Sequence, residues 1–316
     1  MSDNAFVTAF APASIGNVGV GFDMLGLAIA GAGDWVSARK SDGEGVRILE
    51  VQDPDGNRHP FLSANADENT ASIAAASVWS AEGDGAGVEL IVKKGIGLQS
   101  GMGSSAASAV AAAFAVNALL DAPLPTAALI DHALAGEEYA SGGLHADNVA
   151  PSLFGGLVLC PSAILPDVVC LPVPDGVSSV LVHPELQVNT AESRKGLARG
   201  YTTEQWLTQQ GYLAGFVSAC YSGDIDLLGR CLRDELIEPQ RAASVPCFEA
   251  VKEAALRLNA LGCSLSGSGP SIFALCRDKD ALNVATGMEQ ACLLAGYDSQ
   301  SFISPLGSPG AHLVER

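Results

Sequence analysis

The chain has 316 residues, with 35 Asp and Glu against 17 Lys and Arg, and its formal net charge is −18. This balance argues against nucleic acid and anionic membrane surfaces as partners, because both require clustered Lys and Arg. With 48% apolar and 16% charged residues, the composition is that of a globular protein rather than a disordered chain. The length suits two domains.

In the first half of the chain, apolar periodicity and turn signals predict the following elements in order: strands Ala5–Ala13, Leu25–Arg39 and Val46–Val51, helix Asn69–Glu82, strand Gly87–Lys93, and helices Ser104–Leu120 and Thr126–Ser141. In the second half they predict strands Ser152–Cys160 and Ser178–His183, helices Glu204–Ser222, Asp224–Glu235 and Phe248–Leu261, strand Ser271–Cys276 and helix Ala281–Ala295. Strands and helices mix without the regular alternation of a parallel-sheet fold, which indicates an α+β architecture with two layers or lobes. We place the boundary near the proline-rich segment Pro161–Pro174, giving domains 1–160 and 161–316.

Several sequence features favour a cytoplasmic protein. The longest apolar stretch, Ala106–Leu120, is interrupted by Ser108 and Asn117 and is shorter than the roughly 20 residues of a membrane-spanning helix. Met1–Asn4 contain no basic residue and no apolar segment follows them, so we expect no signal peptide. The eight cysteines form no C-x-x-C pair, which favours reduced, buried thiols over a zinc site or a disulfide framework.

The segment Lys93–Ala107 is the most informative part of the chain, because a predicted strand leads there into a Gly/Ser loop and then into a helix. Glycines allow close backbone approach to a ligand, and a helix N-terminus offers unpaired N–H groups and the positive end of the helix dipole. This combination favours a phosphate-binding loop over a simple N-cap at Ser104. A Walker motif is excluded by its missing lysine. The match of Gly101–Ala106 to the dinucleotide pattern is weak, since Asp121 follows with no intervening strand.

Two further glycine loops occur at Pro12–Asp23 and Ser264–Ser271. The first loop places a carboxylate and an amide beside glycines, which suits contact with a small polar ligand. The second lies between a predicted helix and a predicted strand and alone suits an ordinary turn equally well. Three such loops in one chain are difficult to explain as unrelated turns.

Taken together, the three loops resemble the three motifs of the GHMP small-molecule kinases, in the order of that family. Pro12–Asp23 resembles the first motif, Gly97–Ala106 the second and Ser264–Ser271 the third. The resemblance covers about residues 5–305. The chain departs from the family pattern at Gly97, where proline is usual, and at Met102, where leucine is usual.

Three further segments resemble the branch of the family that acts on L-homoserine: His145–Gly156, Thr190–Arg194 and Glu238–Arg241. The resemblance implies transfer of the γ-phosphoryl group of MgATP to the side-chain hydroxyl of L-homoserine, a step toward threonine. It also implies a two-domain α+β fold, with a left-handed β-α-β unit in the N-terminal domain and a ferredoxin-like C-terminal domain. Members of the family are often dimeric, so we expect a homodimer.

Site residues follow from the same resemblance. The residues implied for ATP are Asn69, Lys94, Gly97, Leu98, Gln99, Ser100, Gly101, Met102, Gly103, Ser104, Ser105 and Ala106. Those implied for the substrate are Asn17, Asp23, His145, Asp147, Asn148, Thr190, Arg194, Arg241 and Gly269. The expected Mg²⁺ ligands are Ser105 and Glu137, and the expected catalytic residues are Asp23, Asn148, Ser105 and Glu137.

The chemistry of homoserine fits the substrate residues. Its carboxylate calls for a guanidinium fork, supplied by Arg194 and Arg241. Its ammonium group calls for the acceptors Asp23 and Asp147. Two roles remain open for Asp23, which suits a general base or a binding group alone. His145 is a second nominal base.

Other interpretations remain open at this stage. Asn69 also suits a helix N-cap, and Lys94 and Glu137 also suit solvated positions. Alternative functions are a GHMP kinase acting on mevalonate or a sugar, a nicotinamide-dependent dehydrogenase, and a non-catalytic ATP-binding relative. Arg194 and Arg241 favour an amino acid as substrate.

Overall fold

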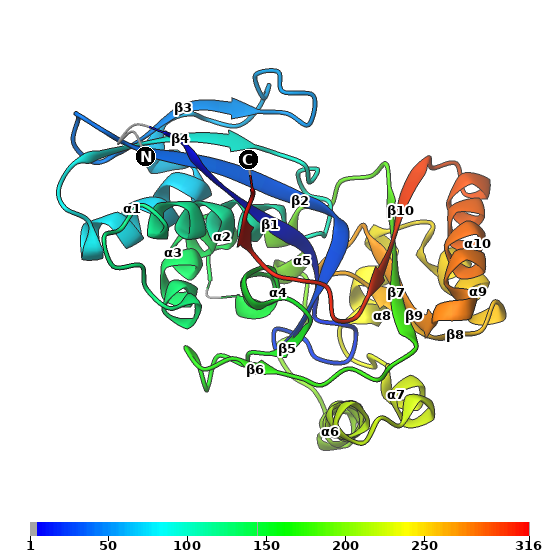
Figure 1. Cartoon of the computed structure of the whole chain (residues 1–316). Helices are drawn as coiled ribbons and strands as arrows, with labels where there is room; N and C mark the ends of the chain where they lie inside the picture. The colour runs from blue at the N-terminus through cyan, green and yellow to red at the C-terminus, as the bar shows by residue number, and fades with distance from the viewer. Residues whose placement is uncertain (1–4, 144, 316) are drawn as a thin grey trace.

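The computed structural model describes residues 5–143 and 145–315 and arranges them in two lobes (Figure 1). Met1–Asn4, on which the expectation of no signal peptide rests, lie outside the described residues. Within the described ranges, no helix is both long enough and apolar enough to cross a membrane.

The first lobe is built on a seven-stranded sheet with the order β11-β1-β2-β4-β3, in which β5 also pairs with β2 and β6. Its strands are β1 (Val7–Gly16), β2 (Leu25–Ser41), β3 (Val46–Gln52), β4 (Gly87–Lys93), β5 (Leu157–Leu159), β6 (Val169–Cys170) and β11 (His312–Leu313). β3 and β4 run parallel, and the only α-helix described between them in the chain is Thr70–Glu82; this is a β-α-β unit, as the family resemblance implies. β6 and β11 come from beyond residue 160, so the C-terminal part of the chain completes this sheet.

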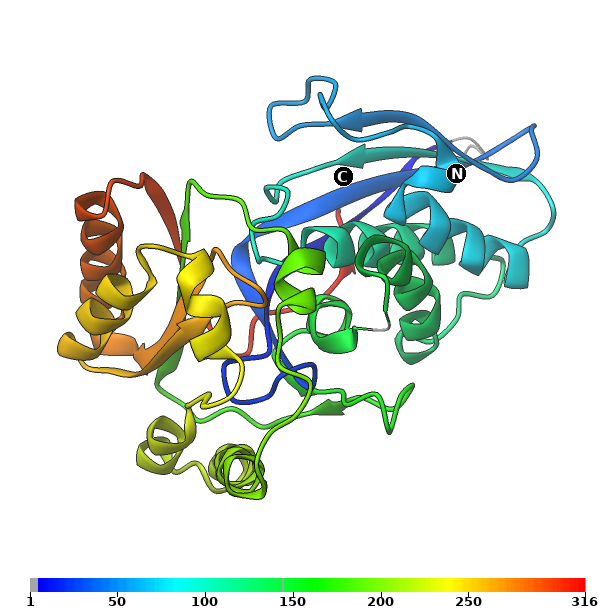
Figure 2. The same ribbon diagram turned by 180° about the vertical axis from the view of Figure 1, so that it is seen from behind.

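Four helices cover one face of this sheet (Figures 1 and 2). They are α1 (Thr70–Glu82), α2 (Ser104–Asn117), α3 (Leu129–Ser141) and α4 (Ala146–Phe154). α2 is rich in alanine and buried on almost every side, because small side chains let neighbouring helices and the sheet approach it closely. The packing fixes the position of the loop at its N-terminus.

The second lobe contains a four-stranded antiparallel sheet with the order β10-β7-β9-β8. Its strands are β7 (Val177–Pro184), β8 (Ala260–Leu265), β9 (Ile272–Arg277) and β10 (Ser299–Pro305). α9 (Phe248–Arg257) and α10 (Ala281–Leu294) pack against the sheet and share its core. The chain order β-α-β-β-α-β with this strand order is ferredoxin-like, which confirms the expected architecture.

Four α-helices lie between β7 and α9 in the chain: α5 (Thr190–Lys195), α6 (Thr203–Ser222), α7 (Ile225–Cys231) and α8 (Glu238–Arg241). The described residues also form 3₁₀ turns at Ala66–Glu68, Thr126–Ala128, Ala242–Ser244 and Asp278–Asp280. The two lobes are in direct contact, since the amide of Ala30 on β2 donates to the hydroxyl of Ser304 on β10 at 2.8 Å.

Two sequence-based element predictions were wrong. The predicted strand Ser152–Cys160 is the last turn of α4 followed by the short strand β5, because a helix continues through Pro151. The predicted helix Phe248–Leu261 ends at Arg257, and β8 begins at Ala260. The third glycine loop therefore connects two strands, not a helix and a strand.

Candidate active site

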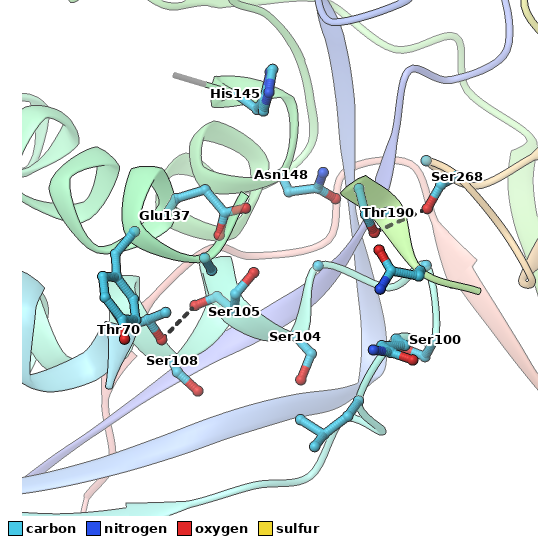
Figure 3. A pocket seen from close by; sticks show the side chains of 18 of the residues that line it. Thr70, Ser100, Ser104, Ser105, Ser108, Glu137, His145, Asn148, Thr190 and Ser268 are labelled. Atoms are coloured by element: carbon cyan, nitrogen blue, oxygen red, sulfur yellow. Dashed lines mark hydrogen bonds between the residues drawn. The ribbon is translucent and has the colours of Figure 1, made fainter. Parts of the chain in front are cut away.

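A cavity of about 530 Å³ lies where the three glycine loops meet, and it receives side chains from both lobes (Figure 3). Its volume is in the range of small-molecule and cofactor sites. The expected site residues that line it are Asn17, Asp23, Asn69, Lys94, Leu98, Gln99, Ser100, Gly101, Gly103, Ser104, Ser105, Glu137, His145, Asp147, Asn148, Thr190, Arg194 and Arg241. One cavity thus brings together residues that are as much as 224 positions apart in the sequence, from Asn17 to Arg241.

Four of the expected site residues do not line the cavity: Gly97, Met102, Ala106 and Gly269. Met102 and Ala106 are buried in the core of the first lobe. The carbonyl of Gly269 packs against Gly101, so this glycine supports the loop from behind.

The loop before α2 depends on two glycines with positive φ. Gly101 has φ +74°, and a Cβ there would collide with the carbonyls of Gly269 and Ser266. Gly103 has φ +69° and serves as the N-cap of α2, where a Cβ would collide with the hydroxyl of Ser14. Glycine is therefore required at both positions. The three loops can touch only because these side chains are absent.

The N-terminus of α2 has no side-chain cap among the described residues. The interpretation of Ser104 as an N-cap was wrong: Ser104 is the first residue of the helix, and its hydroxyl donates to the carbonyl of Ile96 at 3.1 Å. Ser104 and Ser105 line the cavity, so the uncapped first turn of α2 lies at the cavity wall, as an anion site requires.

Lys94 is buried instead of solvated. Its ammonium group forms an ion pair with Asp34 and donates to the carbonyl of Ser104 at 2.8 Å and to the hydroxyl of Ser108 at 2.7 Å. These three contacts occupy its three N–H donors. Nothing in the sequence pattern of β2 marked Asp34, because its partner follows 60 residues later.

One part of the cavity wall contains two guanidinium groups and one carboxylate. Arg194 donates through both terminal nitrogens to Asp23, at 2.8 and 2.7 Å, and this contact raises the pKa of Arg194. Arg241 is 3% exposed and donates to the carbonyl of Gly267 at 2.9 Å. The ring of Phe22 lies 5.3 Å from the guanidinium carbon of Arg194 and 5.1 Å from that of Arg241.

Arg241 has spare hydrogen-bonding capacity. Its buried Nε atom has no hydrogen-bond partner among the described residues. Burial lowers the pKa of Arg241, and the nearby charge of Arg194 lowers it further. A buried, incompletely satisfied guanidinium is a strong candidate for binding a carboxylate ligand.

Asp147 on α4 is a buried acid beside the first glycine loop. Its side chain accepts a hydrogen bond from the amide of Asn17 at 3.1 Å. Burial, with a smaller effect of the Asp23 charge, raises the pKa of Asp147 to about 7. Burial and the neighbouring Arg194 lower the pKa of His145, so its imidazole is neutral at pH 7.

Asn17 and Asn148 fix this part of the site. The side chain of Asn17 donates to the carbonyl of Gly267 at 3.1 Å and accepts from the amide of Asp23 at 3.0 Å. Asn148 accepts from the hydroxyl of Ser14 at 2.9 Å. These bonds connect the first glycine loop to the third loop and to α4.

Ser105 and Glu137 suit a magnesium ion. Both side chains lie at the same side of the cavity in Figure 3, and Glu137 is 7% exposed. In the described part of the chain, no group of three or more His, Cys, Asp or Glu residues could hold a metal. One carboxylate and one hydroxyl nevertheless suit Mg²⁺, because this ion keeps several waters and also binds substrate phosphates.

At the other end of the cavity, Asn69 caps α1. Its side chain accepts from the amide of Ala71 at 3.0 Å and donates to the carbonyl of Ser63 at 3.0 Å. Asn69 lines the cavity beside Leu62 and Val92. The N-cap role and a place on the ligand wall are therefore compatible.

Sequence reasoning missed several lining residues: Leu62, Glu68, Thr70, Val92, Ser108, Tyr139, Ala140, Asn189, Gly267 and Ser268. Gly267 and Ser268 belong to the third glycine loop, so that motif could have identified them. The hydroxyl of Thr190 lies 3.1 Å from that of Ser268, and Thr70 donates to the carbonyl of Ser105 at 3.4 Å (Figure 3). Thr70 and Tyr139 carry no signal in the sequence.

Known proteins are similar to this chain in sequence and in fold. Models of the GHMP kinase N-terminal domain and C-terminal region match residues 69–156 and 216–292. A homoserine kinase of Xanthomonas campestris pv. campestris is 44% identical over 307 residues, which cover 97% of this chain and 93% of that protein. The chain belongs to the GHMP kinase family. This result confirms the family inferred from the three glycine loops.

A further sequence relative and a solved structure support the same family membership. A homoserine kinase of Chlorobium phaeobacteroides is 38% identical over 321 residues, with 98% of this chain and 99% of that protein covered. The crystal structure of a homoserine kinase from Cytophaga hutchinsonii superposes with a TM-score of 0.93 at 39% identity, covering 99% of this chain and 98% of that one. As a GHMP kinase, the protein is a phosphotransferase with an alcohol group as acceptor, and family membership implies the use of ATP.

Proposed function

We propose that this GHMP kinase transfers the γ-phosphoryl group of MgATP to the side-chain hydroxyl of L-homoserine, forming O-phospho-L-homoserine for threonine biosynthesis. One observation carries the proposal. A single cavity is lined both by the glycine loop that leads into α2 and by the guanidinium groups of Arg194 and Arg241. The named relatives are homoserine kinases.

In this proposal, one end of the cavity binds ATP and the other end binds homoserine. The first-turn amides of α2 and the loop Gly101–Ser105 bind the phosphates of ATP. Ser105 and Glu137 would hold Mg²⁺, which when bound neutralises charge on the phosphates. Asn69 lies at the adenosine end.

At the substrate end, Arg241 and Arg194 bind the homoserine carboxylate. The side-chain oxygens of Asp23 and Asp147 accept from its ammonium group, and Asn17 and Asn148 orient its hydroxyl. Asp23 is the group best placed by charge to accept the hydroxyl proton, because His145 is neutral and lies against Arg194. The cavity holds both substrates together, and this positioning is the main requirement of phosphoryl transfer.

The product tests this proposal directly. The purified protein is incubated with ATP, Mg²⁺ and L-homoserine, and the reaction is followed by phosphorus NMR. We expect a phosphomonoester resonance that coincides with authentic O-phospho-L-homoserine and is absent without homoserine. Release of inorganic phosphate as the only product would contradict the proposal.

We expect the enzyme in the cytoplasm, where its eight cysteines, all free and seven of them buried, would stay reduced. A homodimer stays a prediction from the family resemblance. Light scattering after size-exclusion chromatography measures the molar mass, and a value near twice 32.2 kDa is expected.

A further inference from the structure

A buried carboxylate lies beneath the phosphate loop and contacts both of its ends. Asp34, in the middle of β2, is 0% exposed. One of its carboxylate oxygens accepts from the amides of Gly95 and Ile96, at 2.9 and 3.2 Å. These residues open the loop that leads from β4 to α2.

The second oxygen of Asp34 contacts the other end of the loop. It accepts from the hydroxyl of Ser108 on α2 at 2.6 Å and forms the ion pair with Lys94. Lys94 also donates to the carbonyl of Ser104, the first residue of α2. Two amides, one ammonium and one hydroxyl thus converge on a single carboxylate.

This arrangement has a mechanical consequence. The loop contains Gly95, Gly97, Gly101 and Gly103, and glycines have more backbone freedom than other residues. A loop of this composition holds one conformation only if other contacts restrain it. The carboxylate of Asp34 restrains its entry and its exit together, and thereby sets the spacing of the amides that face the phosphates.

We propose that Asp34 is a positioning residue for ATP, which sets nucleotide affinity by holding the two ends of the phosphate loop through Lys94, Ser108 and the amides of Gly95 and Ile96. The inference rests on the proposed function, since it takes this loop as the ATP site. It goes beyond that function because Asp34 does not line the cavity. The ion pair with Asp34 also neutralises the charge of Lys94 inside the protein.

The test compares nucleotide binding with stability. Calorimetry measures the Kd of ADP and of adenosine for the wild type and for Asp34→Asn, well below the unfolding temperature of either protein. The asparagine oxygen still accepts from the loop amides, but the buried ammonium of Lys94 loses its counter-charge. We expect the Kd of ADP to rise about ten- to 100-fold, while the Kd of adenosine changes by less than about twofold, because the proposed function places the phosphates, and not the adenosine, on the loop.

A matched control separates positioning from general destabilisation. Glu89 on β4 is a second buried carboxylate of the same sheet, paired with Arg39 and Arg47. Glu89→Gln also removes a buried carboxylate from its cationic partners, the half-exposed Arg39 and the exposed Arg47. We expect it to lower the unfolding temperature and leave the Kd of ADP unchanged.

Two further variants separate the loss of the loop contacts from the loss of stability. Asp34→Asn with Lys94→Met removes the unpaired ammonium, so stability should recover in part while ADP binding stays weak. Ser108→Ala is a milder change, for use if Asp34→Asn does not fold, and should weaken ADP binding about three- to tenfold.

The possible results separate the inference from the proposed function. Wild-type binding of ADP with an equal Kd in Asp34→Asn or Ser108→Ala would overturn the positioning role alone. ADP affinity that follows the unfolding temperature across all variants, Glu89→Gln included, would also overturn it. A wild type that binds no ADP would overturn the proposed function and the inference with it.

Discussion

Arg194 and Asp23 form a two-point ion pair on the wall of the cavity, in which each terminal guanidinium nitrogen donates to a different carboxylate oxygen, at 2.8 and 2.7 Å. The two residues are 171 positions apart in the chain. The pair connects the first glycine loop to α5. Each of the two residues is also expected to bind homoserine. The substrate must therefore either bind to the intact ion pair or break it.

Replacing Asp23 tests whether it does more than bind substrate. We expect Asp23→Ala to lower kcat by about 10²- to 10⁴-fold, the usual contribution of a general base. Steady-state kinetics with saturating homoserine separates kcat from KM. A near-normal kcat with only a raised KM would show that Asp23 is a binding group and that the proton leaves by another route.

Arg241 should dominate recognition of the substrate carboxylate. Arg241→Lys keeps the charge but loses the planar fork. We expect the KM for homoserine to rise about ten- to 100-fold, as for the loss of one charged hydrogen bond, with the KM for ATP nearly unchanged. Arg257→Lys on the exposed face of α9 is the control. Equal effects on both substrates would argue that Arg241 only supports the fold.

Two neighbouring glutamates on α3 allow the proposed magnesium site to be tested with a matched control. Glu137 is buried on the cavity wall, whereas Glu138 is exposed. We expect Glu137→Gln to reduce kcat by about 100-fold or more and to raise the Mg²⁺ concentration needed for half-maximal activity. Glu138→Gln should behave as wild type. An unchanged magnesium dependence in Glu137→Gln would remove this residue from the metal site.

The raised pKa of Asp147 predicts a pH dependence. If the ionised carboxylate binds the homoserine ammonium, kcat/KM should fall about tenfold for each pH unit below about 7. Asp147→Asn should lower kcat/KM and remove this acid limb. A wild-type profile that stays flat down to pH 5 would contradict the assignment.

The same pKa predicts an effect on stability. Between the ordinary value of 3.8 and about 7, the folded protein binds a proton at Asp147 that the unfolded chain does not. The stabilisation present at low pH is therefore lost as the pH rises through this window. Unfolding temperatures of wild type and Asp147→Asn, measured from pH 4 to 8, should show a smaller loss for the variant.

Two glycines of the phosphate loop should respond differently to substitution. Gly101→Ala combines a positive φ with a collision against the carbonyl of Gly269, so we expect loss of ATP binding. At Gly97 a Cβ would meet no atom closer than 3.9 Å, and Gly97→Ala should bind ATP within about twofold of wild type. Similar ATP affinities for the two variants would contradict the packing of this loop.

Elements with strong local signals were predictable from the sequence. The alanine-rich α2 and the alternating strand β4 follow directly from periodicity. α4 was not predictable in this way, because Pro151 lies inside it and its last apolar residues resemble the start of a strand. β8 was missed because Ala260 and Leu261 extend the apolar pattern of α9 and obscure the helix end at Arg257.

The candidate site shows the same contrast. The glycine loops were visible as motifs, and the family resemblance supplied Arg194, Arg241 and Glu137. Contacts between distant segments were not visible. Asp34 has no local signal because its partners belong to β4 and α2, and the ion pair of Asp23 with Arg194 exists only once α5 lies across the first glycine loop.

Substrate selectivity is the most direct test of the proposed function. ADP release is measured with MgATP and a panel of L-homoserine, L-serine, L-threonine, mevalonate, galactose and shikimate. We predict that kcat/KM for L-homoserine exceeds that for every other alcohol by about 100-fold or more, since only it matches both the guanidinium pair and the reach to the phosphate loop. A higher kcat/KM for mevalonate or galactose would contradict the account and remove Arg194 and Arg241 from substrate recognition.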